Sequence, residues 1–172
     1  NWIAGWSHTG AAADKMIREK HHCADSIVPM LTAALENGVD TFMAPFASLP
    51  HVLEAVRRAE DKAGKRIILV DTPILNVDDN ADARREAEAT VRASAALGAT
   101  FCLIHHTSAE QLVNKNRRII DRLDDYTAMI RDAGMIPGLS AHMPELILYS
   151  DANGYDVETY IQIYNCMGFL MQ

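Results

Sequence analysis

The stretch "AALGATFCLIHHT", residues 95–107, joins a helical pattern to a short apolar run through a single glycine. Glycine suits the position just past a helix because it takes the left-handed conformation without a Cβ clash. The same succession of helix, glycine and apolar run recurs along the chain, at intervals close to the roughly 30 residues of a βαβ unit. The glycines are Gly38, Gly64, Gly98 and Gly134. The sequence therefore predicts alternating helices and strands.

The apolar runs predict strands that are buried on both faces, because they are short and show no clean alternation of apolar and polar residues. The segments between them are amphipathic and predict helices, the third of which starts near Asn80. We expect strands in "NWIAGW" (1–6), "VDTFMAPF" (39–46), "RIILVD" (66–71), "FCLIHH" (101–106), "MIPGLSAH" (135–142) and "TYIQIYN" (159–165). We expect helices over 26–38, 48–64, 80–98 and 117–134, with a short extra helix over 108–116.

Polar side chains follow nearly every predicted strand, and this favours a closed barrel over a doubly wound sheet. We therefore expect an α/β fold of the (β/α)8 TIM-type barrel class, with about six βα units forming a single, partial TIM-barrel domain over residues 1–172. The chain ends on an apolar run, so we expect a C-terminally truncated fragment. The strand-end residues are Ser7, His8, Asp71, Asn76, His105, His106, Ser140, His142, Glu145, Gln162 and Asn165.

Charge and composition limit the partners. The net charge is −7 and no basic run occurs, which argues against nucleic acid. No stretch of about 18 apolar residues occurs, so we expect no membrane span. The three cysteines are far apart, which predicts reduced thiols in a cytoplasmic protein. A small-molecule substrate fits this composition, and the sequence leaves the oligomeric state open.

The strand-end imidazoles suggest catalytic chemistry. Histidine works as an acid or base near neutral pH because its pKa is about 6.5. Together with Asp71 or Glu145, the histidines His8, His105 and His142 could bind Zn²⁺, Mn²⁺ or Fe²⁺. This interpretation predicts a lyase, isomerase or hydrolase that uses a metal or paired acid and base groups. Structural roles remain open for each residue: hydrogen-bonded interior histidines, a turn cap for Asp71, and a helix-dipole partner for Glu145.

Several short motifs resemble the aldo/keto reductase superfamily, or an uncharacterised bacterial branch of barrels near it. They are "NGVDTF" (37–42), "FCLIHH" (101–106), "AGMIPGLSAHMPE" (133–145) and "YIQIYN" (160–165), with "AGWSH" (4–8) typical of the uncharacterised branch. The resemblance implies an NADP-dependent oxidoreductase acting on a small carbonyl or sugar-like substrate. It further implies that His105 polarises the carbonyl oxygen and that Ser140 and Gln162 contact the nicotinamide, with Asn165 on the strand of Gln162.

The chain departs from the catalytic set of that family. The expected aspartate is absent near Met43, the segment "PFASLPH" (45–51) holds no tyrosine, and Pro73 stands closest to the place of the lysine. Only the histidine of the four is present. An incomplete tetrad leaves a third interpretation, a non-catalytic relative that has kept the scaffold.

Overall fold

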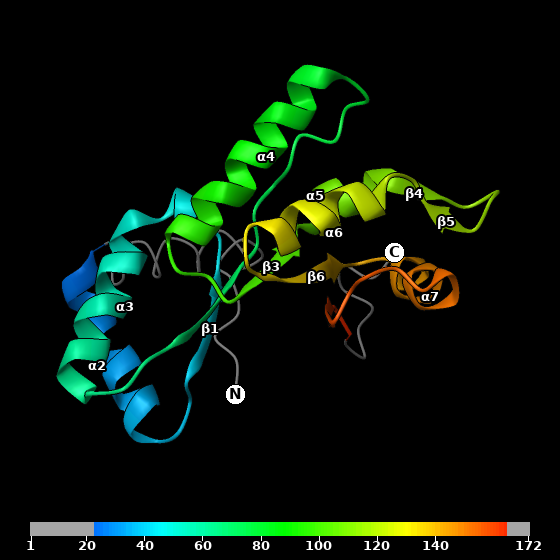
Figure 1. The fold of residues 1–172 in the computed structure, drawn as a ribbon. Helices are drawn as coiled ribbons and strands as arrows, with labels where there is room; N and C mark the ends of the chain where they lie inside the picture. The colour runs from blue at the N-terminus through cyan, green and yellow to red at the C-terminus, as the bar shows by residue number, and fades with distance from the viewer. Residues whose placement is uncertain (1–22, 165–172) are drawn as a thin grey trace, which may run out of the picture. The chain divides into compact units, whose positions relative to one another are not determined.

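The computed structural model describes residues 23–164, so the predicted strand 1–6, His8 and Asn165 lie outside the described residues. The chain divides into two compact units, with the boundary between Val70 and Asp71. Figure 1 labels helices and strands of both units. Within residues 23–164, no helix combines the length and apolar character needed to cross a membrane.

The first unit pairs two helices with two strands. Its elements are α2 (Ala24–Glu36), β1 (Thr41–Ala44), the 3-10 helix η2 (Phe46–Ser48), α3 (Pro50–Ala63) and β2 (Ile68–Asp71), whose last residue already belongs to the second unit. The strands β1 and β2 are neighbours, and the Ile68 N–H donates to the Asp40 carbonyl at 2.7 Å. The helices pack against each other through fully buried side chains such as Ile27, Leu31 and Val56.

The second unit is built on three parallel strands in the order β3 (Phe101–Ile104), β6 (Ile136–Ala141) and β7 (Thr159–Gln162). Gly138 lies in the middle of β6, where a Cβ would come within 2.6 Å of Leu103 Cγ and 2.8 Å of Thr159 Cγ2. The three strands can therefore approach this closely only with glycine at that position. The helices of this unit are α4 (Ala81–Ala96), α5 (His106–Ala109), the 3-10 helix η3 (Glu110–Leu112), α6 (Leu123–Asp132) and α7 (Pro144–Asn153).

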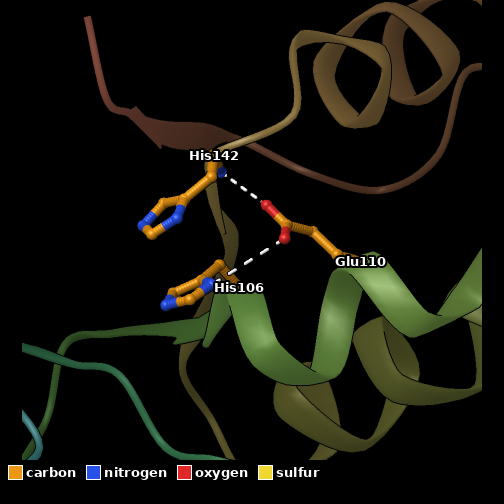
Figure 2. A group of neighbouring side chains, drawn as sticks. All are labelled: His106, Glu110 and His142. Carbon is orange, nitrogen blue, oxygen red and sulfur yellow. Dashed lines mark hydrogen bonds and ion pairs between the residues drawn. The ribbon is translucent and has the colours of Figure 1, made fainter. Parts of the chain in front are cut away.

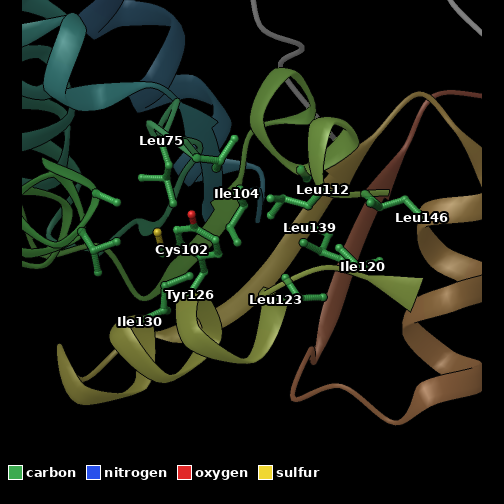
Figure 3. Packing of buried hydrophobic residues seen from close by; sticks show 14 of the residues in the cluster. Leu75, Cys102, Ile104, Leu112, Ile120, Leu123, Tyr126, Ile130, Leu139 and Leu146 are labelled. Atoms are coloured by element: carbon green, nitrogen blue, oxygen red, sulfur yellow. The ribbon is translucent and has the colours of Figure 1, made fainter. Parts of the chain in front are cut away.

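The core of the second unit lies between these strands and their helices (Figure 3). Leu123, Tyr126 and Ile130 on α6 pack into the same buried cluster as the strand residues Cys102, Ile104 and Leu139. Each buried aliphatic side chain of this kind stabilises the fold by about 1.5–3 kcal/mol. Because this packing anchors both β3 and β6, it fixes the ends of those strands, from which the candidate site is built.

The helix–glycine–strand pattern is confirmed. All four predicted glycines have positive φ angles, with Gly38 at 80° and Gly134 at 82° as examples. The helix expected from Asn80 begins there, and the Asn80 side chain accepts a hydrogen bond from the Ala83 N–H at 2.8 Å. Five of the six predicted strands are present, the sixth being the one outside the described residues.

The connection after β3 differs from the sequence prediction. A short antiparallel hairpin, β4 (Val113–Asn114) and β5 (Ile119–Ile120), replaces the end of the predicted short helix and the start of the predicted helix 117–134. The helix α6 begins only at Leu123, after Arg122 in a left-handed conformation with φ of 59°. The two-residue strands are too short to leave an alternating pattern in the sequence.

The predicted (β/α)8 TIM-type barrel is wrong. Residues 23–164 contain seven strands, and two of these form the separate β4–β5 hairpin, so that fewer than eight βα units are present. The fold is α/β with parallel strands, as the buried apolar runs indicated. The error arose because polar residues at strand ends occur at the carboxyl edge of any parallel sheet, open or closed.

Candidate functional site

Two neighbouring strands of the second unit end at the same edge and carry the candidate site. In the register of β3 and β6, Ile104 lies opposite Leu139, so both chains leave the sheet close together. After β3 the chain turns into the continuous helical run of α5 and η3, and His106 and Glu110 are four residues apart on it. After β6 the first residue is His142, just before α7. Ligands of open α/β sheets bind at this carboxyl edge.

His106, Glu110 and His142 form one cluster (Figure 2). Each offers one ligand atom, and these three atoms all lie within 4.8 Å of one another. His106 Nδ1 is 3.8 Å from Glu110 Oε2, and the two side chains are only 15% and 14% exposed. The rings of His106 and His142 stack, with centroids 3.7 Å apart and planes 16° from parallel.

The two carboxylate oxygens of Glu110 have different partners. Its Oε1 accepts the backbone N–H groups of His142 at 2.6 Å and of Met143 at 3.0 Å. These two bonds hold the carboxylate in place and keep the junction between β6 and α7 beside it. The other oxygen, Oε2, points toward the His106 imidazole, as Figure 2 shows. One carboxylate oxygen is thus fixed by the backbone and the second is directed at the His106 ring.

Gln162 supports the same junction from β7. Its Nε2 donates to the carbonyl oxygen of His142 at 3.0 Å and to that of Ile163 at 3.1 Å. Both amide hydrogens are therefore donated to backbone carbonyl groups. Gln162 and Glu110 together hold the carbonyl and the N–H of His142, which fixes where its imidazole leaves the backbone.

His105 lies next to the cluster rather than in it. The strand β3 ends at Ile104, and His105 becomes the N-cap of α5, where its Nδ1 accepts the Thr107 N–H at 3.3 Å and lies 2.8 Å from the Thr107 hydroxyl. Its ring centroid is 4.2 Å from that of His106. The structure therefore brings His106 into the candidate ligand set, with His105 as its neighbour.

Asp71 is fully buried at the end of β2. Its charge is close enough to Cys102 to influence the pKa of that thiol. Burial raises the pKa of the Cys102 thiol to about 12; the nearby Asp71 charge acts in the same direction, and a hydrogen bond to Ser94 opposes it. Such a thiol stays protonated near neutral pH and is a poor nucleophile. Asp71 belongs to no metal-ligating group found among the described residues.

Glu145 lies in the first turn of α7 and forms an ion pair with Lys115 at 3.3 Å. The pKa of Glu145 lies below its ordinary value, first because its own backbone N–H donates to the carboxylate and then because of Lys115. Glu145 is the third residue after His142, yet its carboxylate pairs with Lys115 of the hairpin and not with the imidazoles.

Ser140 and Gln162 lie on opposite faces of the second unit's sheet. Ser140 lies opposite Ile161 in the register and Gln162 lies opposite Ala141, and paired residues of parallel strands share a face. The nicotinamide contact that the resemblance implied for both residues stays a prediction. So does the reductase role of His105.

Sequence reasoning missed Glu110 and placed the emphasis on His105 instead of His106. A signal was available, because His106 and Glu110 have the i, i+4 spacing that puts two side chains on one face of a helix. Recognising it required knowing that a helix starts at His106 and not later.

Comparison with known proteins adds no relative: no protein-family model matches this chain, and no curated protein sequence matches it.

Proposed function

We propose that this protein is a metal-dependent enzyme that acts on a small molecule, with one divalent ion bound by His106, Glu110 and His142. The observation that supports it most strongly is the convergence of two imidazoles and one carboxylate within 4.8 Å at the carboxyl edge of β3 and β6. Two histidines and a glutamate form a ligand set of catalytic Zn²⁺ sites, and non-haem Fe²⁺ uses two histidines with a carboxylate. Zn²⁺ is the first ion to test.

Binding of one ion by both histidines would require the stacked rings to turn, because a ring nitrogen binds a metal along a lone pair that lies in the ring plane. Bonds of about 2.0–2.2 Å in a tetrahedral arrangement place ligand atoms about 3.4 Å apart. The 3.8 Å between His106 Nδ1 and Glu110 Oε2 is close to that separation. Three protein ligands leave a fourth position for substrate or water, as in catalytic zinc sites. A zinc ion there would act as a Lewis acid on an oxygen atom of the substrate, which suits a hydrolase, lyase or isomerase.

The carboxylate is prepared for this task by its backbone contacts. Oε1 of Glu110 is held by two N–H groups, so the conformation of the Glu110 side chain is already fixed before an ion binds. Binding the ion through Oε2 would therefore cost little further conformational entropy. Gln162 performs a related task for His142 by fixing its carbonyl. Metal sites with such supporting hydrogen bonds lose about 10–100-fold in metal affinity when the support is removed.

A zinc titration of the purified full chain tests the proposal, with a chromophoric chelator as competitor. We expect the unaltered chain to bind one zinc ion tightly and the Glu110→Gln variant to lose it. Glutamine keeps an oxygen that can accept the two backbone N–H groups, but it lacks the negative charge of the carboxylate. His142→Ala should weaken binding by more than about 100-fold. The matched control is His51→Ala, which removes a histidine on α3. This variant should bind zinc as tightly as the unaltered chain. Equal affinity in Glu110→Gln and the unaltered chain would refute the proposal.

A further inference from the structure

The loop of the β4–β5 hairpin concentrates positive charge in an acidic protein. Three of the eight Lys and Arg residues between Asp71 and Tyr164 occur within residues 115–118, against fifteen Asp and Glu in the same range. We refer to Lys115, Arg117 and Arg118 as the cationic loop. All three are exposed, and the guanidinium of Arg118 has no ion pair within residues 23–164.

The cationic loop is held in a defined position. Asn114 Oδ1 accepts the Arg117 N–H at 3.1 Å, and the Arg118 carbonyl accepts a hydrogen bond from Asn153 Nδ2 of α7 at 2.9 Å. Arg118 itself has a positive φ of 55°. The backbone is thus anchored at both ends of the loop, while the charged ends of the side chains remain in solvent.

One ion pair connects this loop to the candidate metal site. Lys115 Nζ lies 3.3 Å from Glu145 Oε1, and Glu145 is three residues after His142. Three residues span at most about 11 Å between Cα atoms. The loop also begins five residues after Glu110, another proposed ligand. The Lys115 ammonium group thus contacts the first turn of the helix that follows His142.

We propose that the site takes small substrates that carry an oxyanion, a phosphate or carboxylate group, and that the cationic loop binds this group with Lys115 as the first contact. This inference rests on the proposed metal site. Lysine and arginine bind such groups through charge-assisted hydrogen bonds. In the structure the Lys115 ammonium group is paired with the Glu145 carboxylate, so an oxyanion that binds Lys115 must compete with Glu145 for it.

The competition gives a test that a purely structural ion pair would not pass. Removing Lys115 should weaken binding of the anion, while removing the charge of Glu145 should release Lys115 and strengthen it. If the pair serves only to hold the hairpin against α7, both substitutions break the same contact and act in the same direction. Both side chains are partly exposed, at 59% and 33%, so neither substitution opens the core.

The experiment uses the full chain loaded with one zinc, freed of unbound zinc, and titrated calorimetrically at low ionic strength. The two probes are inorganic phosphate and malonate. We expect Lys115→Met to weaken anion binding about fivefold and Glu145→Gln to tighten it about threefold, in the range of an exposed ion pair. The pair Arg92 and Glu88 on α4 is also exposed, and Arg92→Met and Glu88→Gln are the matched controls that should change nothing.

The outcomes separate cleanly. Binding of phosphate alone assigns a phosphate ester, binding of malonate alone assigns a carboxylate substrate, and binding of both assigns a site that recognises charge. A chain that binds zinc but neither probe overturns this inference and leaves the metal site standing. The same is true if Lys115→Met and Glu145→Gln shift the affinity in the same direction. A chain that binds no zinc overturns the proposed function and this inference with it.

Discussion

Glu60 in the first unit and Glu110 in the second both accept backbone N–H groups at a junction beside a strand, yet their surroundings differ. Glu60 Oε1 accepts the Ile67 N–H at 2.8 Å, and its Oε2 is paired with Arg57 at 2.9 Å and Arg66 at 3.1 Å. Glu110 Oε1 accepts two N–H groups in the same manner, but its Oε2 faces an imidazole.

The difference shows how one arrangement serves two purposes. Arginine is always charged, so two positive charges offset that of the Glu60 carboxylate, whose side chain is only 3% exposed. Glu110 faces an imidazole instead, and carboxylates and imidazoles together form metal-binding sites in proteins. The Glu60 carboxylate, which is paired with two arginines, stabilises the fold. The Glu110 carboxylate, which lies beside two stacked imidazoles, is placed to bind an ion. The predictions below are arranged to separate these two cases.

The largest effect on stability is expected in the strands that carry the site. Gly138→Ala would place a methyl group 2.6 Å from the fully buried Leu103, and overpacking of this kind costs about 3 kcal/mol. Gly154→Ala is the matched control, because that position has a positive φ of 66° but open space around it, so strain alone costs about 1 kcal/mol. Urea denaturation measures both. Equal losses would show that β3, β6 and β7 are not as closely packed as described.

Glu60 should matter for stability and not for metal. Glu60→Ala leaves the buried Ile67 N–H without its acceptor and should lower the free energy of unfolding by about 2 kcal/mol. Zinc affinity should be unchanged, in contrast to Glu110→Gln. Chemical denaturation and the chelator titration, carried out on the same variants, test the two halves of this statement. A loss of zinc binding in Glu60→Ala would remove the distinction between the two glutamates.

The pH dependence of stability sharpens the same contrast. Burial alone would raise the pKa of Glu60, but the Ile67 N–H, Arg57 and Arg66 outweigh it and hold the pKa below its ordinary 4.5. Its stabilising contribution is therefore complete above the unfolded value and is lost as the pH falls through the folded value. The difference in stability between the unaltered chain and Glu60→Gln should shrink from pH 6 to pH 3. A constant difference would contradict this assignment.

The smallest effect concerns Cys102, which is buried beside Asp71 and has a pKa of about 12. Iodoacetamide at pH 8 should leave it unmodified in the folded chain and alkylate it in urea, as peptide mass spectrometry can show. Alkylation of Cys102 under native conditions would mean that this part of the second unit opens readily.

Local features of the fold could be predicted from the sequence because they depend on neighbouring residues. The positive φ of Gly134 follows from its place after a helix, and the capping role of Asn80 follows from its side chain. Whether the parallel sheet is open or closed could not be predicted, since the alternation of helices and strands is the same in both. The β4–β5 hairpin was also missed, because polar residues such as Asn114 and Lys115 leave no strand pattern there.

The candidate site was predicted in part. His142 was expected at a strand end and lies in the cluster, while His105 was expected there and instead caps α5. Glu110 could not be identified without the fold, because its partners at His142 and Met143 are more than thirty residues away in the chain. Which of two adjacent histidines enters a site depends on where a helix starts, and that boundary is decided by tertiary contacts.

X-ray absorption at the zinc edge of the zinc-loaded full chain tests the central claim most directly. The account predicts two imidazole nitrogens and carboxylate oxygen at about 2.0–2.2 Å, with one imidazole lost in His142→Ala. Sulfur scattering at about 2.3 Å, or an unchanged imidazole count in His142→Ala, would show that the ion is bound elsewhere and would contradict the account.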